Sequence, residues 1–219
     1  METSISSIIE KTITFVKKTL EGAEAGHDWF HIQRVYHNAL HINAIENAES
    51  LRVSLAALLH DIADSKFHGG DEEIGPQLAG EFMHQIQIEE SVIEDVKQII
   101  RNMSYKASLG GTTYYSHEMA VVQDADRLDA IGAIGIARAF TYGGYKNRVL
   151  YDPAIPPEQD LNKETYKNSA APTINHFYEK LLRLKDLMHT DTGRKMAEER
   201  HEFMLQFLEQ FYAEWKGKK

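Results

Sequence analysis

Apolar residues recur at intervals of three and four along almost the whole chain, and this period constrains the fold more than any other feature. Ile5, Ile8 and Val16 form one such stripe, and the segment from Glu89 to Met103 repeats the pattern. This spacing places side chains on one face of an α-helix, whereas a half-buried strand needs strict alternation. No alternation of useful length is present. The pattern predicts an all-α, single-domain helical bundle over residues 1–219.

Glycine and proline positions divide this pattern into separate helices. Beyond a first helix near Ile5, we expect helices over residues 28–48, 51–61, 76–85, 89–103, from about 116 through Asp126, 131–143, 173–188 and 191–215. Four of the five prolines fall between Arg148 and Thr173. We therefore expect a loop over about 148–172. We interpret it as a substrate-facing lid within one domain, with a domain boundary as the alternative.

Composition narrows the classes of protein that this chain can belong to. Hydrophobic content of 42% and charged content of 26% are typical of a globular protein, and there is no cysteine. Disulfides and thiolate ligands are therefore excluded, so a metal site must use His, Asp and Glu, and a cytoplasmic location is expected. A net charge of −9 disfavours nucleic-acid and membrane binding, since both need extended basic surface.

The dipeptide His-Asp occurs twice, and the flanking residues separate the two copies. His60-Asp61 ends the apolar run "LAALLHD", where a buried carboxylate is costly unless a cation compensates it. His27-Asp28 follows Gly26 and opens a helix, so Asp28 is explained as an N-terminal cap. We therefore assign a metal site to the second copy only.

Four residues in helix-like segments form a complete set of ligands for one divalent metal ion: His31, His60, Asp61 and Asp126. His60 and Asp61 point about 100° apart on a helix, so both reach an ion that lies between their directions. Two imidazoles and two carboxylates leave two octahedral positions open. This set suits Mn²⁺, Fe²⁺, Co²⁺ or Mg²⁺ better than a closed structural zinc site.

Taken singly, these residues have ordinary structural explanations. His31 alone fits a histidine inside a helix, and Asp126 alone fits a surface acid, since Asp124 and Asp129 flank it. The His60-Asp61 pair alone is evenly balanced between the two interpretations. It is the order of the residues together with their flanks that favours a joint metal site.

Those flanks, "HIQRV", "AALLHDIAD" and "QDADRLDA", resemble the HD-domain superfamily of metal-dependent phosphohydrolases over about residues 26–139. That superfamily has a His before "xxRV", an "HD" after an apolar run and an Asp before "RL". The segments "GHDWFHIQRV", "NHFYEKLLRLKDLM" and "RHEFMLQFLEQF" are similar to a small stand-alone bacterial branch. The resemblance implies an all-helical fold and hydrolysis of nucleoside triphosphates, deoxynucleotides included, to monophosphate and pyrophosphate. It implies Mn²⁺ as cofactor, with Mg²⁺, Fe²⁺, Co²⁺ and Ni²⁺ as alternatives.

Two further residues are candidates for moving protons. Asp64 lies three residues after Asp61, on nearly the same helix face, and is our candidate for orienting or deprotonating the attacking water. His27 lies one turn before His31, and we assign it to proton donation. The structural alternative for each is a local cap or a surface residue.

Phosphate oxygens need cations, and three residues are candidates. Arg34 lies one turn after His31, and Lys106 follows a helix in "MSYK". Lys180 is a candidate through the resemblance alone. For each of them, the structural alternative is an ordinary surface cation.

The expected function is therefore a nucleoside triphosphate pyrophosphohydrolase. A 5′-nucleotidase or a phosphodiesterase on the same metal site remains an alternative, as does a non-catalytic HD module that binds a nucleotide. The expected partner is a small phosphorylated substrate, a nucleotide, with neither nucleic acid nor membrane. We expect the protein to be a monomer or a homodimer.

Overall fold

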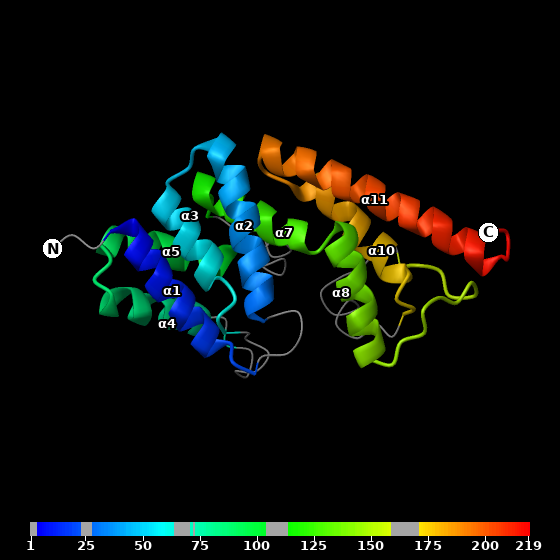
Figure 1. The fold of residues 1–219 in the computed structure, drawn as a ribbon, viewed down its shortest axis with the longest axis horizontal. Coiled ribbons are helices and arrows are strands. Elements are labelled where there is room, and N and C mark those ends of the chain that lie inside the picture. Colours follow the sequence, from blue (N-terminus) through cyan, green and yellow to red (C-terminus); the bar gives the residue numbers. More distant parts are fainter. Residues whose placement is uncertain (1–3, 23–27, 64–70, 72, 104–113, 159–170) are drawn as a thin grey trace. The chain divides into compact units, whose positions relative to one another are not determined.

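The computed structural model describes residues 4–22, 28–63, 71, 73–103, 114–158 and 171–219. Every regular element in these ranges is a helix (Figure 1), which confirms the predicted all-α fold. The chain forms two compact units, Met1–Asp126 and Arg127–Lys219. The prediction of one domain over 1–219 stays a prediction. Within the described ranges, no helix has the length and apolar character that crossing a bilayer requires.

The first unit is organised around a buried central helix. Its helices are α1 (Ile5–Thr19), α2 (Trp29–Glu46), α3 (Ser50–Leu59), α4 (Ile74–Gln85), α5 (Glu90–Asn102) and most of α7 (His117–Asp129). Helix α3 packs against α1, α2 and α5, and α4 packs against α5. Residues Val53 to Leu59 of α3 are all buried, as the apolar run predicts. This burial places the end of α3, and with it His60, inside the unit.

Helix α2 begins where the sequence predicts, because Asp28 caps it. The Asp28 Oδ1 atom accepts a hydrogen bond from the His31 backbone N–H at 3.0 Å, which confirms the predicted cap. The helix ends at Asn47, whose φ of 57° is left-handed, a conformation that asparagine tolerates at helix ends. The cap fixes His31 in the first turn of α2.

The second unit differs from the prediction in one element. It contains the end of α7 together with α8 (Gly132–Tyr145), α10 (Asn175–Glu179), the 3₁₀ helix η2 (Leu181–Leu187) and α11 (Asp191–Trp215), and α11 packs against α8 and η2. The single helix predicted over 173–188 is divided at Lys180, whose φ of −138° and ψ of −59° are not helical. After it, Leu181 and Leu184 are buried at a spacing of three, which is one full 3₁₀ turn.

Candidate metal centre

Three of the four predicted ligands meet within the first unit. His31 lies in the first turn of α2, His60 is the C-cap of α3, and Asp126 lies near the end of α7. The Nε2 atoms of His31 and His60 are 3.3 Å apart. Asp126 Oδ1 lies 3.5 Å from the Nε2 atom of His31 and 3.9 Å from that of His60. One ligand atom from each residue thus lies within 4.8 Å of the other two.

These separations fit a single small cation. Ligand atoms about 2.1 Å from one ion are about 3.0 Å apart at right angles and about 3.4 Å apart at tetrahedral angles. The observed separations of 3.3 to 3.9 Å need only small side-chain movements to reach these values. Imidazole nitrogen with carboxylate oxygen suits divalent ions of the first transition row.

The His60 ring is oriented by the helix that carries it. Its Nδ1 atom lies 2.9 Å from the Ala57 carbonyl oxygen, so Nδ1–H donates to that carbonyl and Nε2 presents its lone pair. The two histidine rings lie edge to face, with centroids 5.3 Å apart. A metal-binding histidine commonly donates its other N–H in this way. Sequence reasoning missed Ala57, because its contribution is a backbone carbonyl and the only signal is its place three residues before His60.

The two histidine side chains are buried, and Asp126 is the residue of the three that is partly exposed to solvent. Their side chains are 3% and 6% exposed, whereas the Asp126 side chain is 35% exposed. Every other residue from Met119 to Asp129 is buried. Asp124 and Asp129, which suggested that Asp126 is an ordinary surface acid, are both buried, so they no longer support that interpretation. Asn38 of α2 donates a hydrogen bond to the Ala125 carbonyl oxygen at 3.2 Å, which ties α2 to α7 next to Asp126.

The other predicted site residues are not part of the converging group, and some of them lie outside the described residues. Asp61 directly follows His60 and is half-buried, but the group of three converging ligand atoms does not include it. Arg34 is half-buried on α2, one turn after His31. Lys180 belongs to the second unit, between α10 and η2. Three predicted residues lie outside the described residues: His27, Asp64 and Lys106.

The second unit holds a group of cations around a histidine. Burial, and then the positive charges of Lys180 and Arg148, lower the pKa of His176 to about 3. The Arg148 guanidinium carbon lies 5.5 Å from the centre of the Tyr142 ring. Sequence reasoning missed Arg148 and His176. A signal was available for His176, since it lies four residues before Lys180 and so on the same helix face.

Comparison with known proteins identifies the family. The HD domain model matches residues 29–131, which include all three converging residues. The chain is 40% identical over 206 residues to YpgQ of Bacillus subtilis (strain 168), covering 92% of this chain and 90% of that protein. The chain belongs to the HD-domain family.

Solved structures of HD-domain proteins share the fold. An HD-superfamily hydrolase from Bacillus thuringiensis is 45% identical with a TM-score of 0.78, over 97% of this chain and 99% of that one. Bacillus subtilis YpgQ in complex with ADP is 37% identical with a TM-score of 0.76, over 97% of each chain. Membership of this family and the three converging ligands together support a hydrolase that uses a divalent metal ion.

Proposed function

We propose that this HD-domain protein is a metal-dependent phosphohydrolase that converts nucleoside triphosphates and deoxynucleoside triphosphates to the monophosphate and pyrophosphate. The observation that carries the proposal is the convergence of His31, His60 and Asp126 in a chain whose structural neighbours include an HD-superfamily hydrolase. Two nitrogens and one oxygen leave coordination positions for water and substrate, as a hydrolytic site requires.

Asp61 completes the ligand set in this proposal, because it follows His60 directly where α3 ends. The proposed ion is Mn²⁺, with Mg²⁺, Fe²⁺, Co²⁺ and Ni²⁺ as alternatives. When bound, it supplies Lewis acidity, which lowers the pKa of a water molecule and offsets phosphate charge. The Ala57 carbonyl supports this role by keeping the lone pair of His60 Nε2 available to the ion.

Other residues of the chain move protons and hold the substrate. We assign Asp64 to accepting a proton from the attacking water and His27 to donating one to the leaving pyrophosphate. Arg34, one turn after His31, and Lys106 offset charge on the phosphate oxygens. Each role depends on a charge or a proton that the side chain carries near neutral pH, so each is open to a conservative substitution.

We propose a nucleotide as the substrate class for two reasons: one relative binds a nucleotide, and the second unit of this chain is rich in cationic residues. YpgQ forms a complex with ADP. In this chain, residues 127–219 hold 15 of the 24 Lys and Arg residues but only 13 of the 33 Asp and Glu residues. Within this unit the positive charges of Lys180 and Arg148 act on His176, and Lys180 is our proposed phosphate-binding cation there. A triphosphate carries more negative charge than a monophosphate, so it gains more binding energy from cationic side chains.

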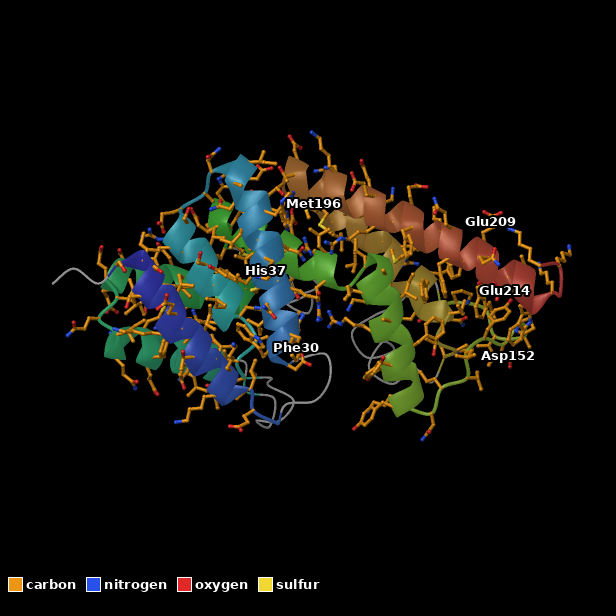
Figure 2. The ribbon with its side chains drawn as sticks, in the orientation of Figure 1. Phe30, His37, Asp152, Met196, Glu209 and Glu214 are labelled. Atoms are coloured by element: carbon orange, nitrogen blue, oxygen red, sulfur yellow. The ribbon has the colours of Figure 1, made fainter. Side chains whose placement is uncertain are left out.

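Product analysis tests the proposal. The protein is loaded in parallel with Mn²⁺, Mg²⁺ or Co²⁺, incubated with nucleoside mono-, di- and triphosphates, and the products are separated by chromatography. We expect monophosphate plus pyrophosphate from triphosphates. His60→Ala should remove this activity, whereas His37→Ala, at an exposed histidine on α2 (Figure 2), should keep it.

Four outcomes contradict the proposal. Nucleoside and phosphate from a monophosphate identify a 5′-nucleotidase. Cleavage of a phosphodiester, added to the panel as a further substrate, without cleavage of triphosphates identifies a phosphodiesterase. Bound metal and bound nucleotide without turnover identify a non-catalytic binding module. Retained activity in His60→Ala contradicts the assignment of the site itself.

A further inference from the structure

The last turn of α7, which follows Asp126 directly, is held by arginine side chains within the second unit. Arg138 Nη1 of α8 donates to the Asp129 carboxylate at 2.6 Å and to the Asp129 carbonyl oxygen at 3.3 Å. Arg200 Nη1 of α11 donates to the Leu128 carbonyl oxygen at 2.5 Å. The final carbonyls of a helix have no partner inside that helix. These two arginines supply such partners, and we call Asp129, Arg138 and Arg200 the α7 anchor.

The α7 anchor contains a buried carboxylate, so breaking it is costly. Asp129 is 1% exposed, and a buried carboxylate that loses its cation is strongly destabilising. Burial lowers the pKa of Arg200, and the nearby charge of Asp129 opposes that shift. The guanidinium groups therefore bind the end of α7 through charge-assisted hydrogen bonds, which are stronger than neutral ones.

A glycine just after α7, Gly132, leaves space for the Arg200 side chain. Gly132 has a φ of +72°, and a Cβ atom on it would lie 3.0 Å from Cγ and 3.1 Å from Cβ of Arg200. A side chain at this position would therefore press on the arginine, and its backbone conformation favours glycine. Gly132 thus gives the turn after α7 a path that leaves room for the arginine.

Asp126 lies one turn before Asp129 on the same continuous helix. The preceding turns of α7 are held separately, since Glu118 accepts a hydrogen bond from the Glu49 N–H at 3.1 Å and Asn38 donates to Ala125. A metal ligand must be held within about 0.5 Å of its productive position. We expect rotation or fraying of the last turn of α7 to move the Asp126 carboxylate by more than this.

We propose that the α7 anchor positions Asp126 for metal binding, so that Arg200 and Arg138 are positioning residues of the metal centre although neither is a ligand. The inference rests on the proposed metal site, but it does not depend on which phosphate bond the protein cleaves. It predicts that substitutions in the second unit weaken metal binding without changing any metal-binding side chain.

The test measures Mn²⁺ affinity in the whole protein without nucleotide, by following free Mn²⁺ with electron paramagnetic resonance during a titration. The variant is Arg200→Met, which keeps most of the packing and removes the hydrogen bond. Its matched control is Arg194→Met on the same helix, where Arg194 donates to the Met188 carbonyl oxygen at 3.4 Å rather than to α7. We expect Arg200→Met to weaken binding about tenfold, the lower end for residues that orient a metal ligand. Arg194→Met should stay within twofold of the wild type.

Arg200→Lys provides the rescue, because an ammonium group also donates to the Leu128 carbonyl and should restore most of the affinity. If Arg200→Met does not fold, Arg138→Gln makes the same test at a side chain that is 29% exposed. Unchanged Mn²⁺ affinity in folded Arg200→Met, or an equal loss in Arg194→Met, overturns the inference. A protein that loses affinity as expected but cleaves no triphosphate supports the α7 anchor and contradicts the proposed reaction.

Discussion

Two adjacent glycines in the last turn of α8 should respond in opposite directions to the same substitution. A Cβ atom on Gly143 would lie 2.2 Å from Thr173 Oγ1 and 3.2 Å from Thr173 Cγ2, whereas a Cβ atom on Gly144 would meet nothing within 4 Å. Neither glycine has a positive φ, so alanine fits both backbones. Comparing Gly143→Ala with Gly144→Ala therefore measures the effect of side-chain packing, because the change in backbone entropy is the same in both variants.

The magnitudes follow from two opposing effects. Alanine in place of glycine stabilises a helix by about 0.5–1 kcal/mol, and Gly144→Ala should gain that amount. Gly143→Ala gains the same but must displace Thr173, a buried β-branched residue, and such overpacking costs about 1–3 kcal/mol. We expect the two variants to differ in unfolding free energy by about 2 kcal/mol, or by about 4–8 °C in Tm for a chain of this length.

Urea unfolding followed by circular dichroism measures the difference. Thr173→Ala removes the two nearest of the three atoms that the new Cβ atom would meet and leaves only Thr173 Cβ, at 3.3 Å. Gly143→Ala combined with Thr173→Ala should therefore recover most of the loss, a coupling that a double-mutant cycle detects. Equal stability of Gly143→Ala and Gly144→Ala would refute the reasoning. A loss in Gly143→Ala that Thr173→Ala does not relieve would refute the assigned contact.

Two further predictions concern charge. In Mn²⁺ at about 100 times Kd, the wild type should gain about 2.7 kcal/mol of stability. Asp126→Asn should lose this gain, whereas the control Asp95→Asn, at an ion-paired acid on α5, should keep it. Removal of metal with EDTA should make the stabilities of the wild type and Asp126→Asn alike. An equal Mn²⁺-dependent shift in both variants by scanning fluorimetry would exclude Asp126 as a ligand. Because the pKa of His176 falls from 6.5 to about 3 on folding, the unfolded chain takes up the proton first, so stability falls as the pH drops below 6.5. The wild type should lose about 2 kcal/mol between pH 7 and pH 5 through this group, and a His176→Gln variant with the same pH dependence in urea titrations would contradict the assignment.

The helices could be predicted from the sequence because their signals are local. The predicted start of α2 depends on one cap, Asp28, and the structure contains that hydrogen bond. The burial of α3 follows from an uninterrupted apolar run. The division at Lys180 was not predictable in the same way, since Leu181 and Leu184 lie at a spacing that both a 3₁₀ helix and an α-helix tolerate. Only the backbone angles distinguish the two.

The site was predictable as a set of residue types, but its supporting contacts were not. His31, His60 and Asp126 stand out because imidazoles and a carboxylate recur with recognisable flanks. The Ala57 carbonyl that orients His60 is a backbone group that every residue has, so no residue type in the sequence indicates its role. The Arg138–Asp129 pair joins residues on two successive helices, so its formation depends on how those helices pack.

Three aspartates lie within six residues of α7, and their surroundings give them different roles. Asp129 is buried against Arg138, whose charge compensates it. Asp124 is fully buried, in a stretch that leaves only Asp126 partly exposed. Asp126 faces two imidazoles, which bind a divalent ion as neutral ligands and leave the carboxylate charge for the ion to balance. The same residue type thus anchors the helix at one position and, in the proposed site, binds the ion at another. A substitution at Asp129 should therefore lower stability and weaken metal binding indirectly, whereas a substitution at Asp126 removes a ligand itself.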